Sequence, residues 1–473
     1  MKNKIYLLAA IILAGFSFGC QPESDELNPE ITDALSKRAP SQFQTDNYIV
    51  ITKDETLPAR LAQKIEDAGG IINSEMSEVG VLAVTATNKQ FTKQVSRMQE
   101  VRYLIPDLKL QWRQPGIQVD FEKDLANPPF AEPGEIDPFY NFQWGLDAID
   151  APDAWQSGYK GAGVKVAVLD EGFWLEHPDL EPNIIGAISS VPGESPQFEP
   201  YVNESGTLVY FSHGTHVAGT IAAPINDLGV VGVAPEAKLL LVKVLSEKTG
   251  SGEFSWIING IYLSALYGVD VINMSLGASI PQGIGIGSNQ VAALRVAVDR
   301  AINFAHKSGA VVITSAGNSA RNANKDGSMI VFPASSPKAI AISATAPEGW
   351  IYNFSTNLDV FASYSNFGSS LIDFAAPGGD FDFPEPLFFY DMVLSTSLID
   401  ASGNAGYSFS AGTSMAAPHA AGVAALIIGK YQGNIDPAKV EDILRKSADD
   451  LGKPGKDDYY GYGRVNAYKA IME

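Results

Sequence analysis

The strongest constraint on the fold is an alternation of short apolar segments with helical segments after residue 160. The apolar segments are rich in Val, Ile, Leu and Ala, as expected for strands buried on both faces. They lie at residues 164–169, 238–245, 270–274, 310–314 and 339–344. The helical segments lie at residues 213–223, 255–267, 290–306, 414–431 and 437–447. This order predicts an α/β domain with a parallel sheet flanked by helices, whose ligand sites lie beyond the carboxyl ends of the strands.

A smaller unit precedes this domain at residues 46–112. Strand patterns occur at residues 48–52, 71–74, 79–86 and 101–105. One helical pattern covers residues 58–68, and Asn88 is expected to cap a second one. The order βαββαβ predicts a small ferredoxin-like sandwich. Many binding modules share that order, so it assigns no function by itself.

Three motifs in the large domain carry residues suited to nucleophilic catalysis. Asp170 ends the first apolar segment, His213 begins a helix rich in Gly and Ala, and Ser414 begins another helix directly after Gly412-Thr413. Taken singly, they could be a turn carboxylate, a structural histidine and a capping serine. A zinc site at His213 and His216 is not favoured, because no glutamate lies between them in a His-Glu-x-x-His pattern.

Together, the motifs resemble the subtilisin-like serine protease family, in which the triad follows the chain order Asp, His, Ser. The resemblance runs from about residue 137 to the C-terminus. It implies a serine endopeptidase that works through an acyl-enzyme, with Ser414 as nucleophile, His213 as general base and Asp170 as its orienting carboxylate. Asn318, which follows the segment at residues 310–314, matches the family's oxyanion asparagine.

The resemblance also places a substrate cleft. The implied strand-pairing edge consists of Gly250, Ser251 and Gly252, and the implied specificity pocket of Ser275, Leu276, Gly277, Ser315, Ala316, Gly317 and Val331. None of these residues is charged, so a basic preference in that pocket is not expected. Val331 stands where several relatives have glycine, which predicts a shallow pocket for small or medium apolar side chains.

Calcium is the cofactor that the resemblance implies, in a structural role. The loop that begins at residue 224 resembles the family's calcium loop. The implied oxygen ligands are Asp137, Asp179, Pro224, Asn226, Leu228 and Val230.

Glu171 departs from the family pattern, which has Thr or Ser directly after the catalytic aspartate. We expect its side chain to face solvent.

The first 20 residues have the pattern of an export signal, with two lysines and then an apolar run that ends near Cys20. Cys20 is the only cysteine, which excludes a disulfide within the chain. Its position resembles a bacterial lipoprotein signal, in which Cys20 would be lipidated; ordinary signal cleavage is the alternative. Both predict an exported protein, either a cell-envelope lipoprotein or extracellular. Residues 21–45 are polar and predict a flexible tether.

The position of the small unit, between a signal and a peptidase domain, resembles an inhibitor-type propeptide. The propeptide at residues 46–112 would then be an intramolecular inhibitor, followed by a linker at 113–138 that contains the maturation cleavage and a peptidase domain at 139–473. An unrelated interaction domain is the alternative.

The formal net charge of −21 argues against a nucleic-acid partner, because binding phosphates needs a basic face. The expected partners are therefore peptide or protein substrates, with membrane contact only through a lipid anchor, and the chain is expected to act as a monomer. A catalytically inactive scaffold and a serine esterase remain alternatives, although no Gly-x-Ser-x-Gly elbow surrounds Ser414.

Overall fold

The structure is a computed structural model that describes residues 45–113, 118–120, 136–203, 205–281, 287–325, 327, 329–399 and 404–473. The predicted signal, Cys20, all of the tether except residue 45, and most of the predicted linker lie outside these residues. Within them, no helix is both long and apolar enough to cross a membrane.

The large domain is built on an eight-stranded sheet, and all five predicted strands are present in it. They are β7 (Lys165–Asp170), β11 (Lys238–Lys243), β13 (Val271–Met274), β15 (Val311–Ser315) and β17 (Ala339–Ala346). The order is β18-β17-β15-β13-β7-β11-β8, with β19 also paired to β17. All pairings are parallel except that of β18 with β17. The sequence did not reveal the additional strands β8 (Ile184–Ser189), β18 (Val360–Phe361) and β19 (Phe374–Pro377).

Helices cover both faces of the sheet, as the unbroken apolar strands require. Along β7, Val166 and Val168 face one apolar cluster, and Ala167 and Leu169 face the other, because neighbouring side chains of a strand point to opposite faces. The first cluster contains residues of α6 (His213–Ala222), α9 (Thr413–Lys430) and α10 (Pro437–Ser447). The second contains residues of α7 (Phe254–Leu266) and α8 (Ser288–Lys307).

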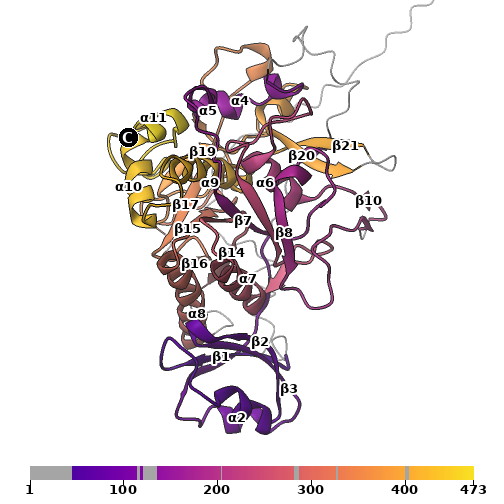
Figure 1. Cartoon of the computed structure of the whole chain (residues 1–473), viewed down its shortest axis with the longest axis vertical. Coiled ribbons are helices and arrows are strands. Elements are labelled where there is room, and N and C mark those ends of the chain that lie inside the picture. The colour runs from indigo at the N-terminus through magenta and orange to yellow at the C-terminus, as the bar shows by residue number, and fades with distance from the viewer. Residues whose placement is uncertain are drawn as a thin grey trace, which may run out of the picture.

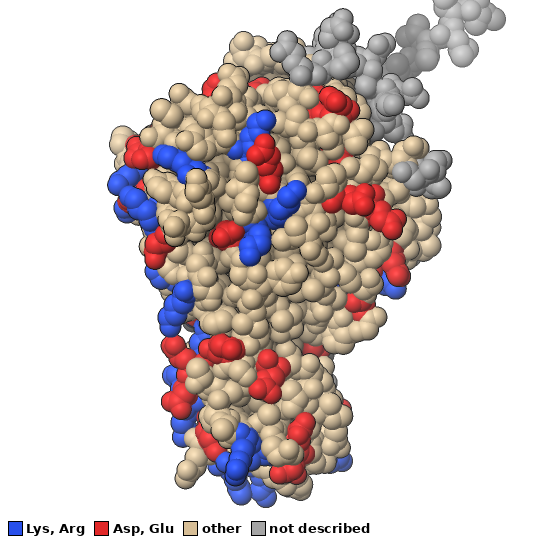
Figure 2. Space-filling view, in the orientation of Figure 1, with Lys and Arg blue, Asp and Glu red and all other residues tan. Residues whose placement is uncertain are grey.

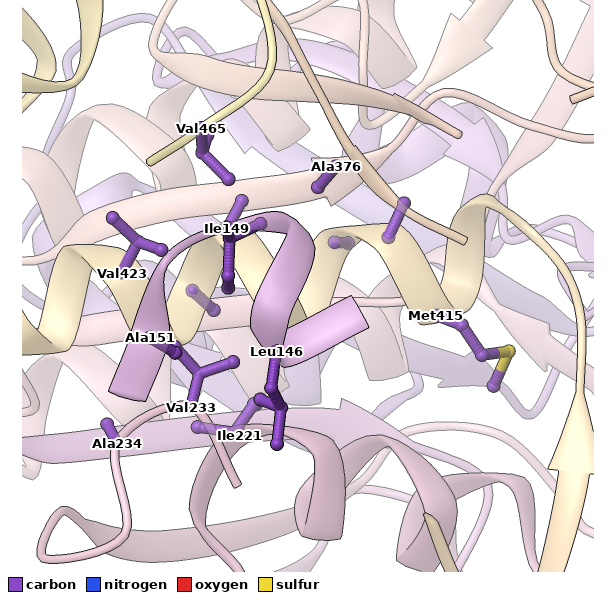
Figure 3. Close-up of a cluster of buried hydrophobic side chains, with 14 of the residues drawn as sticks. Leu146, Ile149, Ala151, Ile221, Val233, Ala234, Ala376, Met415, Val423 and Val465 are labelled. Carbon is purple, nitrogen blue, oxygen red and sulfur yellow. The ribbon is translucent and has the colours of Figure 1, made fainter. Parts of the chain in front are cut away.

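Residues of two short helices, α4 (Trp144–Ala148) and α5 (Ala151–Gln156), also pack in the first cluster. Figure 3 shows Leu146 beside Ile221 of α6, and Ile149 belongs to the same cluster as Val423 of α9. The two helices that carry His213 and Ser414 therefore share one packed core.

The N-terminal domain has the predicted order of elements. They are β1 (Asn47–Thr52), α2 (Leu61–Asp67), β2 (Gly70–Met76), β3 (Val81–Ala86), α3 (Phe91–Val95) and β4 (Val101–Pro106), in an antiparallel sheet of order β2-β3-β1-β4. Val50 packs in the domain's own core, whereas Ile49 and Ile51 on the opposite face join the cluster of α7 and α8. The sheet is therefore buried on both sides. The N-terminal domain forms a separate lobe next to α7 and α8, with α2 on its far side (Figures 1 and 2).

Polar contacts add to this apolar interface. The Arg300 guanidinium on α8 donates to the carbonyl oxygens of Thr52, Lys53 and Asp54 at 3.0–3.3 Å. At the start of α7, a side-chain oxygen of Asp107 accepts a hydrogen bond from the Ser255 N–H (3.2 Å). The N-terminal domain is thus fixed to the two helices of one face of the sheet.

Two histidines lie in the core beneath the site. The Nε2 atom of His216 lies 3.1 and 3.0 Å from the carbonyl oxygens of Val393 and Ser408, so its contacts are structural. His419 lies 2.8 Å from the carbonyl oxygen of Met415 through Nδ1. Burial lowers the pKa of His216 to about 3 and that of His419 to about 4.

The replacement His419→Gln should therefore change how stability depends on pH. A histidine in an unfolded chain has a pKa of about 6.5. Below that pH the unfolded chain takes up a proton at His419, whereas the folded chain does not until the pH reaches about 4. The contribution of His419 to the free energy of unfolding is therefore highest above about pH 6.5 and decreases as the pH falls towards about 4. Between pH 7 and pH 5, the free energy of unfolding of the parent should fall by about 2 kcal/mol more than that of the variant. Urea unfolding of both chains in a Ser414→Ala background measures this difference. If parent and variant differ in free energy of unfolding by the same amount at pH 7 and pH 5, the prediction is contradicted. The control is His306→Gln, at a more exposed ring, which should give a smaller change with pH.

Candidate active site

Three neighbouring strands deliver polar residues to one edge of the sheet. Asp170 ends β7, the segment that begins at Ser275 follows β13, and Ser315 ends β15. These strands lie in the order β15-β13-β7. Sequence reasoning expected the candidate catalytic residues beyond this edge, and Asp170, His213, Asn318 and Ser414 lie close together there.

Asp170 and His213 form a close pair in the interior. The His213 Nδ1 atom lies 2.9 and 3.0 Å from the two carboxylate oxygens of Asp170. Ser212 caps the helix that His213 begins, by accepting a hydrogen bond from the Thr215 N–H (3.1 Å). Gly214 permits the approach, since a Cβ atom there would lie 2.6 Å from the carbonyl oxygen of Gly172.

Ser414 lies in the first turn of α9 and is tied to the segment after β13. Its Oγ atom donates a hydrogen bond to the carbonyl oxygen of Ser275 (3.2 Å), and the Ser275 hydroxyl donates to the carbonyl oxygen of Ser414 (2.7 Å). Ser414, His213 and Asn318 line one small cavity.

The orientation of Asn318 is set by Thr413, a residue that sequence reasoning did not single out. The Asn318 side-chain oxygen accepts hydrogen bonds from the backbone N–H of Thr413 (3.0 Å) and from its hydroxyl (2.7 Å). The Asn318 Nδ2 atom is thereby left as a donor. A Cβ atom at Gly412 would lie 3.3 Å from that Nδ2 atom and 3.6 Å from the Ser414 nitrogen, so both donors border the same space. The sequence feature that could have pointed to Thr413 is its position directly before Ser414.

An extended segment of the chain itself lies along the predicted strand-pairing edge. β5 (Lys109–Gln111) pairs antiparallel with β12 (Ser251–Glu253). The N–H groups of Trp112 and Arg113 both donate to the carbonyl oxygen of Gly250 (3.1 Å each). On the other side, the Gly277 N–H donates to the carbonyl oxygen of Trp112 (2.9 Å). The segment therefore lies between the two edges that were predicted to bind substrate.

The same part of the chain pairs with a second strand near the site. β6 (Gln118–Asp120), which lies within the predicted linker, forms an antiparallel pair with β21 (Ala405–Ser410). Arg113 and Gln118 both line the cavity that contains His213, Asn318 and Ser414. Two described segments that precede the subtilase domain therefore border the cavity.

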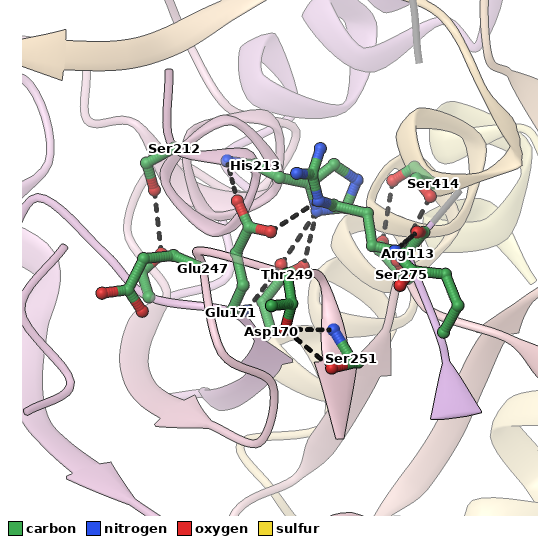
Figure 4. Close-up of polar contacts among 12 residues, drawn as sticks. Arg113, Asp170, Glu171, Ser212, His213, Glu247, Thr249, Ser251, Ser275 and Ser414 are labelled. Carbon is green, nitrogen blue, oxygen red and sulfur yellow. Dashed lines mark hydrogen bonds and ion pairs between the residues drawn. The ribbon is translucent and has the colours of Figure 1, made fainter. Parts of the chain in front are cut away.

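The prediction that Glu171 faces solvent is wrong. Its side chain is 1% exposed, and its Oε2 atom lies 2.5 Å from the Arg113 Nε atom (Figure 4). Its Oε1 atom accepts a hydrogen bond from the His213 N–H (3.3 Å). Burial raises the pKa of Glu171, and the charges of Arg113 and His213 oppose that rise. The error arose because the cation that faces Glu171 comes from the segment that follows the N-terminal sheet.

The residues of the predicted specificity pocket lie near the site, but their role in selectivity stays a prediction. Leu276, Ala316 and Val331 are buried. Val331 packs with Ala316 in a small apolar cluster. The Gly317 N–H donates to the Thr413 hydroxyl (3.0 Å), and the Ser315 hydroxyl donates to the carbonyl oxygen of Leu276 (3.4 Å).

Two buried carboxylates lie at the predicted calcium loop. Asp137 Oδ1 accepts hydrogen bonds from the N–H groups of Asn226 (3.3 Å) and Asp227 (2.7 Å), and Asp179 Oδ2 accepts one from Val230 (3.0 Å). The second oxygen of each carboxylate is buried without a hydrogen-bond partner among the described residues. Burial raises the pKa of Asp179 to about 8 and that of Asp137 to about 6, and the Asp137 charge adds to the rise at Asp179. Within the described residues, no group of three or more His, Cys, Asp or Glu side chains could hold a metal, so any such site would need amide and carbonyl oxygens.

The model of the subtilase family matches residues 161–463. The chain belongs to the subtilase family. It is 34% identical to subtilisin NAT of Bacillus subtilis subsp. natto over 442 residues, which cover 93% of this chain and 94% of that protein. It is 40% identical to subtilisin of Bacillus pumilus over 329 residues, which cover 70% of this chain and 98% of that protein. These similarities identify this subtilase as a serine endopeptidase.

Solved structures agree with this assignment of the fold. The epidermin leader peptide processing serine protease EpiP of Staphylococcus aureus matches 90% of this chain and 98% of its own, with a TM-score of 0.68 and 23% identity. A protease of Pseudoalteromonas arctica matches 71% of this chain and 98% of its own, with a TM-score of 0.56 and 33% identity. The first match extends over the N-terminal domain as well as the subtilase domain.

Proposed function

We propose that this subtilase hydrolyses peptide bonds with Ser414 as nucleophile, His213 as general base and Asp170 as the group that orients His213. The observation that carries the proposal is the contact of His213 Nδ1 with both Asp170 oxygens, at 2.9 and 3.0 Å. This contact leaves the Nε2 atom of the ring to receive the proton of the Ser414 hydroxyl. Asp170 then stabilises the imidazolium that forms.

Before it reacts, the Ser414 hydroxyl has to turn from the Ser275 carbonyl oxygen, to which it donates at 3.2 Å. The rotation would bring Oγ towards His213, which lines the same cavity. Oγ then attacks the scissile carbonyl carbon, and His213 returns the proton to the leaving amine. Water hydrolyses the acyl-enzyme by the same sequence of proton transfers.

Asn318 Nδ2 and the Ser414 N–H are the proposed donors to the oxyanion. The support is their common position around Gly412 and the fixed orientation of the Asn318 amide. Preorganised donors are effective because they need no reorientation when the charge develops.

The test is labelling of the purified protein with a fluorophosphonate, together with casein hydrolysis. Ser414→Ala should abolish both signals. Asn318→Ala should lower kcat about 100- to 1,000-fold, which is the loss measured in subtilisin itself when such a donor is removed. Labelling that does not depend on Ser414 would contradict the proposal. Labelling with ester hydrolysis but no proteolysis would favour an esterase.

We further propose that the chain is made as an autoinhibited precursor. The support is the antiparallel pairing of β5 with β12 and of β6 with β21, together with the position of Arg113 and Gln118 in the lining of the cavity that contains Ser414. A peptide substrate would bind by adding a strand to the same edges. The N-terminal domain fixes this segment to the cleft through its contacts with α7 and α8, so a substrate competes with a tethered part of the chain. Maturation by cleavage within residues 113–138 would remove that competition.

Calcium is the proposed structural cofactor, held by Asp137, Asp179 and Asn226 with the carbonyl oxygens of Pro224, Leu228 and Val230. The partnerless buried oxygens of the two aspartates fit a hard cation that prefers oxygen ligands. The bound ion would neutralise two carboxylates whose burial is otherwise unfavourable. Export through the signal at residues 1–20, with lipidation of Cys20, and action as a monomer complete the proposal.

Calcium should stabilise the Ser414→Ala chain against heat in a way that depends on Asp179. A free concentration a hundredfold above Kd should add about 2.7 kcal/mol, relative to the chelated protein. The Asp179→Asn variant should lose most of that increment. The matched replacement Asp227→Asn, at an exposed side chain of the same loop, should keep it. Equal melting temperatures of the parent chain with calcium and with chelator would contradict the assignment.

A further inference from the structure

A second charged pair lies beside the pair of Asp170 and His213. In Figure 4, the side chains of Arg113 and His213 lie next to each other, and each faces one of the two adjacent carboxylates. Glu171 is buried, whereas Arg113 is partly open to the cavity and 21% exposed at its side chain. The carboxylate therefore belongs to the wall of the cleft, and its cation belongs to the segment that lies in the cleft.

The other cationic groups near Glu171 among the described residues, His213 and Lys243, both face other carboxylates; His213 is paired with Asp170. Lys243 is close to Glu171 in space. Its Nζ atom would lie 3.5 Å from a Cβ atom added at Gly172, the residue that follows Glu171. However, the Lys243 ammonium is already paired with Glu247 and with Glu194 (3.0 Å). The Lys243 ammonium is therefore already neutralised by two carboxylates. Arg113 is the cation that pairs with Glu171.

The backbone around Arg113 pairs with the edges of the cleft in the way that an added peptide strand would. Its N–H donates to Gly250, and the preceding residues pair with β12 and with Gly277. The next described residues along the chain form β6, whose Gln118 lines the same cavity as Arg113 and Ser414. A substrate that lies in the same direction would place the residue equivalent to Arg113 on the N-terminal side of its scissile bond.

When the precursor segment leaves the cleft, Glu171 loses its counter-ion. A buried carboxylate without a partner is costly, and the planar guanidinium of arginine matches a carboxylate well. We propose that Glu171 makes the enzyme select substrates with a basic side chain at the position that Arg113 occupies in the precursor. The inference rests on the proposed function, because it names the substrate class of the same cleft.

This selectivity is separate from that of the pocket formed by Ser275, Leu276 and Gly277. That pocket carries no charge, whereas Glu171 follows β7 directly and contacts the first residue of α6. The enzyme would therefore combine an uncharged residue in one subsite with a basic residue in another.

The test uses the full chain, expressed and matured, with peptides that carry either arginine or citrulline at one of the four positions before the scissile bond. Citrulline has nearly the same shape as arginine and no charge. At one position, kcat/KM should be about tenfold or more higher for arginine, a ratio that corresponds to about 1.4 kcal/mol. In the Glu171→Gln variant that ratio should fall close to one, while the ratios at the other three positions stay as they are. Glu236→Gln, which makes the same charge change at an exposed residue, should keep the arginine preference.

Equal rates for arginine and citrulline at all four positions would overturn the inference, and this comparison needs the parent enzyme alone. A preference that survives in Glu171→Gln would overturn it as well. Both results leave Ser414-dependent proteolysis intact, so they leave the proposed function standing. Failure of every peptide, together with absent labelling of Ser414, would overturn the proposed function and the inference together.

Discussion

Two adjacent carboxylates at the buried end of a central strand are the constraint on which the site depends. Asp170 and Glu171 are each 1% exposed, and burying two neighbouring acids is unfavourable unless each has a cation or hydrogen-bond donors. His213 satisfies Asp170, and Arg113 satisfies Glu171. Because Arg113 precedes the subtilase domain in the chain, this one requirement links the pair of Asp170 and His213 to the segment that follows the N-terminal sheet and lies in the cleft.

The fold provides this arrangement through simple means. Parallel strands end at a common edge, so Asp170, the segment after β13 and the segment after β15 meet without long loops. Helices α6 and α9 present His213 and Ser414 from their first turns, and a shared apolar core fixes the two helices relative to each other. Positioning on rigid elements keeps the proposed oxyanion donors and the proposed base in place before substrate binds.

The central architecture could be predicted from the sequence because buried parallel strands and long helices have strong patterns. The three triad candidates and Asn318 lay at the ends of those elements. Edge strands such as β8 were missed, since its residues are half-buried and lack an unbroken apolar pattern. Strand β20 (Val393–Ile399) was missed because it buries Ser395, Thr396 and Ser397, which read as loop residues. The environment of Glu171 depends on a contact between domains, which local patterns do not contain.

A double-mutant cycle between Arg113 and Glu171 tests the account most directly. The free energy of unfolding would be measured for the full chain with Ser414→Ala, for Arg113→Gln, for Glu171→Gln and for the double variant. The account predicts that each single change is destabilising and that the double change costs less than their sum, by roughly 1–3 kcal/mol. Additive effects within about 0.3 kcal/mol would mean that the two side chains do not depend on each other, and would contradict it.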